Sequence, residues 1–208
     1  LLSEACIEFS KYSAEDHLAN AQKYAHDIIG NLNEGMNVFL DWNLVLNEVG
    51  GPNHVQNFCD APFFFDTDQK QLIRRELQSY VNHFSHYIEN GSVRIGVSRY
   101  TDKLEITAFR KDNRIVFVLL NRTGEEIPAF IRLKDSCAGF IAAPNSILTG
   151  LLMTDTGCFP DAASGNTDIF FVGVVFHKQA FFCVLVRIDR HLREQLCSSR
   201  WRPFIREW

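Results

Sequence analysis

The sequence lacks the short motifs that mark several common classes of enzyme and metal protein. Its six cysteines show no CxxC or CxxH spacing, which argues against a zinc ribbon, and they are too few for a disulfide-dense scaffold. No GxSxG motif of an α/β-hydrolase is present. The segment Gly50–Pro52 lacks the lysine and the helix start of a phosphate-binding loop. The cysteine pattern leaves the redox compartment open.

The chain also lacks an excess of charge of one sign and any long apolar run. The formal net charge is −4 over 208 residues with both signs mixed, so nothing marks a nucleic-acid binder. The two apolar runs near the C-terminal end are each under about 10 residues, short of the roughly 20 that a spanning helix needs. The hydrophobic share of 46% is ordinary for a chain that buries a core.

The most informative stretch is DWNLVLNEVGGPNHVQNFCD, residues 41–60. We expect one strand over residues 38–46, an apolar run interrupted only by the triplet DWN. A turn-forming Gly-Gly-Pro follows, and then a loop that reaches Asn57 and Phe58. Barrel enzymes build sugar sites in this way, because rigid strand ends present the loops that carry the chemistry. Trp offers a flat apolar face to a sugar ring, and Asn offers both a donor and an acceptor to hydroxyls.

Two motifs in this order resemble glycoside hydrolase family 30, the glucosylceramidase family. DWNLVLNEVGGPNHVQNF is similar to the end of the last barrel strand and its loop, and Ser3-Glu4-Ala5-Cys6 resembles the nucleophile motif on the preceding strand. The resemblance extends more weakly over residues 1–152. It implies the last two βα units of a (β/α)8 TIM barrel, an α/β part, followed by an all-β antiparallel sandwich. We expect domains at 1–90 and 91–152, and a tail of uncertain origin at 153–208.

The resemblance also implies roles for individual residues. Glu4 is the expected catalytic nucleophile of a retaining glycosidase, in which two carboxyl groups lie about 5–5.5 Å apart. The other candidates border the sugar pocket and bind substrate: Cys6, Trp42, Asn43, Asn57 and Phe58. Plainer interpretations remain open, since a lone acid is usually exposed, Trp42 is a suitable core residue, and Cys6 is a suitable small buried one. Asn43 and Asp41 are alternatively structural hydrogen-bonding residues.

Periodicity predicts two helices and a run of strands. Helical spacing predicts one helix over 13–32, closed by Gly35, and another over 68–87. His83 and His86 on the second helix lack the carboxylate of an HExxH motif, so packing is favoured over metal binding. After Gly91 the period becomes two, typical of an antiparallel sandwich. The expected strands are 93–97, 104–108, 115–120, 127–133 and 146–152.

The implied reaction is hydrolysis of a β-glucoside, such as glucosylceramide, through a covalent glycosyl-enzyme, with no metal or organic cofactor. Membrane contact is expected only through a lipid substrate. The family's acid/base Glu lies on an earlier strand, and none of Glu8, Glu15 and Glu34 replaces it. We therefore interpret the chain as a fragment that is inactive alone. The alternative function is a non-catalytic carbohydrate-binding sandwich. The compartment and the oligomeric state stay open, with secretion, a lysosome or the cytoplasm all compatible.

The tail from residue 153 lies outside the resemblance to family 30. Its two apolar runs, IFFVGVVF and AFFCVLV, are followed by an arginine-rich end. Three interpretations stay open: a strand pair or small extra unit, a membrane hairpin with runs that are too short, or sequence that is not native to the coding frame. We assign the tail no function.

Overall fold

The computed structural model describes residues 2–7, 14–52, 58–134, 136–154, 169–176 and 186–187. The chain opens with β1 (Leu2–Ala5), α1 (Ala14–Asn33) and β2 (Phe39–Asp41). β1 and β2 are parallel neighbours joined through α1, as the predicted βα crossover requires. Gly35 has a φ of +95°, the left-handed conformation that commonly ends a helix, and this confirms the predicted helix end.

The predicted single strand over residues 38–46 is wrong, because the structure divides it into two. β2 ends at Asp41, and β3 (Val45–Asn47) belongs to a separate sheet, where it pairs in parallel with β4 (Phe63–Asp66). The break falls at the polar triplet. There the backbone N–H of Trp42 is shared between the carbonyl of Ala5 in β1 and Oδ1 of Asp41, and beyond this point the chain pairs with β4 instead of β1.

The second predicted helix starts later than its periodicity indicates. Residues 71–74 form β5 (Gln71–Arg74), antiparallel to β4, after a turn in which Lys70 has a φ of +54°. Only α2 (Glu76–Ser85) is helical. Leu72 and Ile73 have helical spacing, but they pair across the sheet with phenylalanines of β4, and aromatic–aliphatic cross-strand pairs stabilise a sheet.

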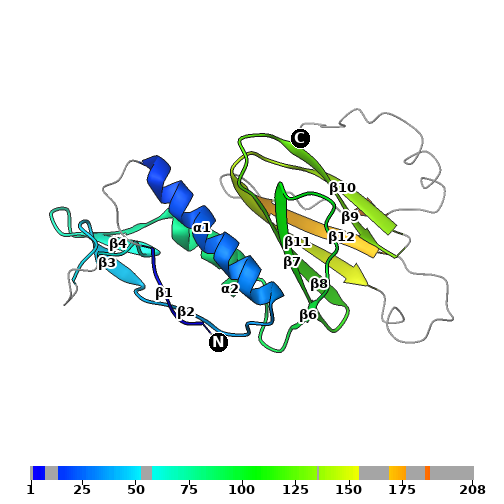
Figure 1. Ribbon diagram of the computed structural model, residues 1–208, viewed down its shortest axis with the longest axis horizontal. Coiled ribbons are helices and arrows are strands. Elements are labelled where there is room, and N and C mark those ends of the chain that lie inside the picture. The colour runs from blue at the N-terminus through cyan, green and yellow to red at the C-terminus, as the bar shows by residue number, and fades with distance from the viewer. Residues whose placement is uncertain are drawn as a thin grey trace.

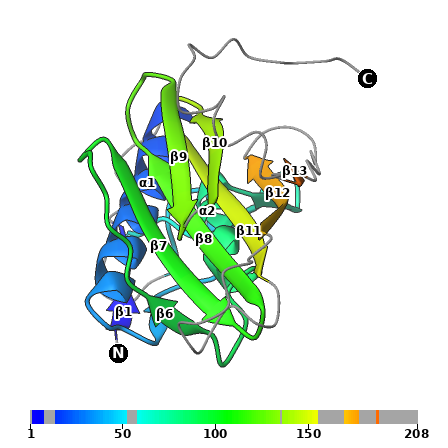
Figure 2. The ribbon, with the colours of Figure 1, turned by 90° about the vertical axis from the view of Figure 1, so that its right-hand side faces the viewer.

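The second part of the chain is antiparallel, as predicted (Figures 1 and 2). A six-stranded sheet has the order β13-β12-β11-β8-β7-β6, and β9 and β10 form a separate hairpin. Residues 136–142 were not predicted as a strand, but they form β10. The strands are β6 (Val93–Ile95), β7 (Leu104–Lys111), β8 (Arg114–Asn121), β9 (Ile127–Leu133), β10 (Ser136–Ala142), β11 (Ser146–Thr154), β12 (Ile169–Phe176) and β13 (Val186–Arg187).

The two faces of the six-stranded sheet bury different partners. Val118 and Leu120 of β8 pack against α1 and α2 on one face. Phe117 and Leu119, the alternate residues, pack under the β9–β10 hairpin on the other face. Successive side chains of a strand point to opposite faces, so one strand contributes to both layers. Figure 2 shows the hairpin in front of the sheet and the helices behind it.

Part of the tail extends this sheet. β12 pairs antiparallel with β11 along its length, and β13 pairs with β12. Over these residues the structure agrees with the strand-pair interpretation, and the rest of the tail lies outside the described residues. Within the described ranges, no helix has both the length and the apolar character needed to cross a membrane.

Packing on the face of the six-stranded sheet that lies under the β9–β10 hairpin depends on a glycine. A Cβ added at Gly150 of β11 would overlap the ring of Phe117, whose side chain is fully buried. We expect Gly150→Ala to lower the free energy of unfolding by about 1–3 kcal/mol through overpacking, as measured by denaturant unfolding. Gly124→Ala is the matched control, because nothing lies within 4 Å of its added Cβ. Equal losses for the two variants would contradict this account.

Candidate active site at the ends of β1 and β2

Two backbone hydrogen bonds bring three segments of the candidate site together. The N–H of Trp42 donates to the carbonyl of Ala5, and the N–H of Asp60 donates to the carbonyl of Ile7, both at 2.8 Å. Ala5 and Ile7 follow Glu4, which lies in β1. Trp42 follows β2, and Asp60 ends the loop after Phe58. The carboxyl ends of parallel strands meet at one edge of a sheet, where barrel enzymes carry their chemistry.

The described side chains at this edge are accessible. Trp42 is 43% exposed and Phe58 is 40% exposed, so the interpretation of Trp42 as a core residue is wrong for this chain. Cys6 is also exposed, which contradicts its interpretation as a small buried residue. Asn43 is half-buried beside Trp42. The predicted contacts of these residues with a sugar stay predictions.

Two of the predicted residues fall outside what the structure describes. The backbone of Glu4 belongs to β1, but its side chain lies outside the described part, and so does the whole of Asn57. The separation of Glu4 from a second carboxylate therefore stays a prediction, as does the hydrogen bond from Asn57 to a sugar hydroxyl.

Tyr24 is a residue at this edge that the sequence interpretation missed. Its hydroxyl donates a hydrogen bond of 2.8 Å to Oδ1 of Asp41, from α1 to the end of β2. Burial raises the pKa of Tyr24 above its ordinary range, and the charge of Asp41 adds to this effect. Tyr24 therefore donates this bond as a neutral hydroxyl. Its sequence position on the apolar face of a helix gave no sign of this polar contact.

Asp41 has an incomplete set of hydrogen bonds. Oδ1 accepts from Tyr24 and from the N–H of Trp42, but Oδ2 is buried without a hydrogen-bond partner among the described residues. Burial raises the pKa of this carboxyl, the two hydrogen bonds oppose the rise, and the charge of Asp60 adds to it. The end of β2 thus carries a carboxylate whose charged form is partly uncompensated.

The one histidine of α2, His83, has a structural role in the described chain. His83 is buried under β11, and its Nδ1 lies 2.8 Å from Oγ1 of Thr149. This contact agrees with the predicted packing role. Within the described ranges, no three His, Cys, Asp or Glu side chains are grouped so that they could hold a metal ion.

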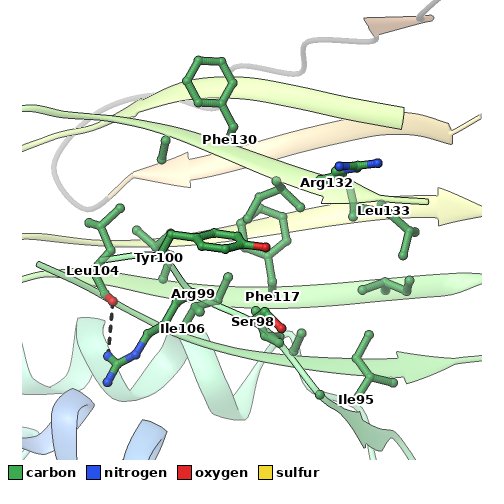
Figure 3. A pocket seen from close by; sticks show the side chains of 18 of the residues that line it. Ile95, Ser98, Arg99, Tyr100, Leu104, Ile106, Phe117, Phe130, Arg132 and Leu133 are labelled. Atoms are coloured by element: carbon green, nitrogen blue, oxygen red, sulfur yellow. Dashed lines mark hydrogen bonds between the residues drawn. The ribbon is translucent and has the colours of Figure 1, made fainter. Parts of the chain in front are cut away.

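A cavity of about 680 Å³ lies away from this edge, between the six-stranded sheet and the β9–β10 hairpin (Figure 3). Aliphatic side chains of β7 and β8 line it, together with the exposed side chains of Tyr100 and Phe130. No Asp or Glu is among the described residues that line this cavity. None of the described residues predicted from the sequence to form a site lines this cavity. They lie at the ends of β1 and β2, which we therefore take as the candidate active site.

Two family descriptions match the chain in sequence. The Glycosyl hydrolase family 30 TIM-barrel domain matches residues 1–88, and the Glycosyl hydrolase family 30 beta sandwich domain matches residues 91–150. The chain belongs to glycosyl hydrolase family 30. The predicted fold class is thereby confirmed: part of a TIM barrel with two parallel strands is followed by an antiparallel β-sandwich.

Relatives in family 30 are similar over the same region. The chain is 34% identical over 144 residues to "Lysosomal acid glucosylceramidase" of Mus musculus, covering 67% of this chain and 28% of that protein. It is 37% identical over 101 residues to "Putative glucosylceramidase 1" of Caenorhabditis elegans, covering 47% of this chain and 19% of that protein. The solved structure of SrfJ from Salmonella typhimurium has a TM-score of 0.67 and 32% identity, covering 72% of this chain and 34% of SrfJ. The chain thus spans about a third or less of each relative.

The raised pKa of Asp41 predicts a pH dependence of stability. A carboxyl whose folded-state pKa lies above its ordinary value of 3.8 stabilises the fold below that value, and this contribution is lost as pH rises through the folded-state pKa. Relative to Asp41→Asn, the unchanged chain should therefore lose thermal stability as pH rises from about 3.8 toward 7. Thermal midpoints measured for both proteins across this pH range test the direction of the change in stability.

The control for this prediction is Asp27→Asn, which removes an exposed carboxylate from α1. A difference between the unchanged chain and Asp41→Asn that stays constant with pH, or that matches the Asp27→Asn control, would contradict the raised pKa.

Proposed function

We propose that the chain carries one part of the active site of a retaining β-glycosidase that acts on β-glucosides such as glucosylceramide. The observation that carries the proposal is the convergence of the Glu4 segment, Trp42 and the Phe58 segment through two backbone hydrogen bonds. Membership of family 30 supports the reaction class, and the relatives named as glucosylceramidases support the substrate. We also propose the division into domains at 1–90 and 91–152, with the tail at 153–208.

In this mechanism Glu4 is the nucleophile. Its carboxylate attacks the anomeric carbon, the bond to the leaving group breaks, and a second carboxylic acid protonates the departing oxygen. The resulting glycosyl ester is hydrolysed by a water molecule, which the same second carboxylate activates as a base. Two inversions at the anomeric carbon give overall retention. Both steps use carboxyl groups and water, so the mechanism requires no metal or organic cofactor.

The accessible aromatic residues would bind the sugar. The flat face of Trp42 offers an apolar wall for a pyranose ring, and Phe58 extends this wall from the neighbouring segment. Asn57 and Asn43 would bond sugar hydroxyls, and Cys6 would line the pocket next to the nucleophile. A lipid-linked substrate would bring the protein to a membrane through its substrate alone.

A second carboxylate is essential to this mechanism, and we propose that it is supplied from outside these 208 residues. One carboxylate cannot serve as nucleophile and as acid/base in the same turnover. The isolated chain should therefore show no turnover of an aryl β-glucoside, measured by release of the aryl alcohol. Glu4→Gln serves as the control for contaminating glycosidases. Turnover by the isolated chain that Glu4→Gln abolishes would show that the chain is complete for catalysis.

The role of Glu4 is tested by covalent labelling in the complete product of the gene that encodes these residues. A cyclitol epoxide, which mimics a β-glucoside, should attach to Glu4, as shown by intact mass and peptide mapping. Glu4→Gln should abolish the label, because the amide is not a nucleophile. Glu34→Gln, which removes an exposed carboxylate after α1, should label at the unchanged rate.

The outcomes separate the two candidate functions. Labelling that survives Glu4→Gln would remove Glu4 from the nucleophile role. A protein that retains a β-glucoside in equilibrium binding, but never forms a covalent adduct, would instead be the carbohydrate-binding protein of the alternative interpretation.

A further inference from the structure

Asp60 is a fully buried carboxylate close to the candidate active site. It is 1% exposed and lies two residues after Phe58. A buried carboxylate is costly unless it is paired and hydrogen-bonded. Asp60 has such partners: its Oδ1 lies 2.6 Å from Nη1 of Arg75, and its Oδ2 accepts a hydrogen bond of 3.3 Å from Asn20. Nδ1 of His17 lies 3.6 Å from the same Oδ2.

These partners connect Asp60 to both helices. His17 and Asn20 lie in the first turns of α1, and Arg75 directly precedes α2. Arg75 is itself held in place, because its N–H donates to the carbonyl of Pro62 and its guanidinium lies 4.5 Å from the ring centroid of Phe64. The Arg75 side chain is also buried. The ion pair therefore has little freedom to move relative to the helices.

The backbone of Asp60 makes the complementary connection to β1. Its N–H donates to the carbonyl of Ile7 at 2.8 Å, three residues after Glu4. Its neighbours Cys59 and Ala61 are buried together with Leu46 in a small apolar cluster. One residue thus links the helices through its side chain and the segment after Glu4 through its backbone.

We propose that Asp60 is a positioning residue of the glycosidase site, holding Phe58 and the segment that follows Glu4 in a fixed mutual position through its ion pair with Arg75. This inference rests on the function proposed above. Asp60 is buried and acts through the groups it holds. Pre-organisation of this kind matters because a displacement of about 1 Å at a reacting group can slow a reaction about 100-fold. A purely structural ion pair would contribute to stability alone.

The experiment compares two single variants with their double variant, in the complete gene product. Asp60→Asn removes the charge but keeps the size, and Arg75→Gln removes the partner charge. Each is measured for its thermal midpoint, and for the limiting rate and the half-saturating concentration of Glu4 labelling by a cyclitol epoxide. Asp60→Asn should lower the midpoint, because Arg75 is left as a buried charge without its carboxylate. It should also lower the limiting labelling rate by about tenfold or more.

The double variant Asp60→Asn/Arg75→Gln separates positioning from stability. It leaves neither charge uncompensated, so the thermal midpoint should recover. The limiting labelling rate should stay low, because the ion-pair link from Arg75, at the start of α2, to the segment after Glu4 is still missing. Asp66→Asn is the matched control, since that carboxylate accepts hydrogen bonds from backbone N–H groups of its own turn, and it should label at the unchanged rate.

Two results would overturn the positioning role. One is a double variant that recovers both the midpoint and the labelling rate, which would make the ion pair purely structural. The other is Asp60→Asn that labels as fast as the unchanged protein. If the unchanged protein does not label, the proposed function fails, and the positioning role fails with it.

Discussion

The packing of α1 and α2 against one face of the six-stranded sheet is the contact on which the rest of the structure depends. Buried residues of both helices form one continuous cluster with Val118, Leu120 and Ile147 of the sheet. The partial barrel offers the helices little other surface to pack against, since β1 and β2 form only a two-stranded sheet. Two strands alone are marginally stable in water. The helices therefore derive much of their packing from the sandwich, and Figure 1 shows them between the sandwich and the strands of the partial barrel.

Polar contacts at the rim of this cluster fix how the helices lie on the sheet. The hydroxyl of Tyr80 donates to the carbonyl of Asn145, and the side chain of Asn33 donates to the carbonyl of Ile106. Apolar packing alone would let the helices slide along the sheet, whereas hydrogen bonds to individual carbonyl groups fix one position. With α1 fixed in this way, Tyr24 lies opposite Asp41 and Asn20 lies opposite Asp60. The sandwich thus sets the geometry of the candidate site without contributing the residues we assign to catalysis.

The sequence allowed prediction of features that depend on local pattern. Helical spacing closed by Gly35 predicts α1, alternation predicts β7, and a continuous apolar run predicts β8. The failures have a common cause, because partners distant in the sequence decide the outcome. Residues 71–74 are strand because β4 is beside them, and the run at 38–46 divides because its halves pair with different strands. Local periodicity contains no information about which neighbour a segment will meet.

In the candidate site, too, features set by local motifs were predictable, and contacts between residues distant in the sequence were not. The order of the two motifs predicted that the Glu4 segment and Trp42 belong to neighbouring strands, and the parallel pair β1–β2 confirms this adjacency. The supporting residues were not predictable. Tyr24 and Asp41 are 17 positions apart, and Asn20 and Asp60 are 40 positions apart. Each looks like an ordinary helix or loop residue until the fold brings its partner to it.

The surface of the partial barrel has two features that bear on the proposed site. Large apolar residues of β2, the following bend and β3 are exposed together, including Leu40, Trp42 and Leu44. Extended apolar surface of this kind usually marks a contact region. Beside it, Oδ2 of Asp41 is buried without a donor among the described residues, although buried carboxylates are normally bonded on both oxygens. The apolar surface is the wall that we propose for the sugar ring, and the missing hydrogen bond to Oδ2 agrees with the raised pKa of the Asp41 carboxyl.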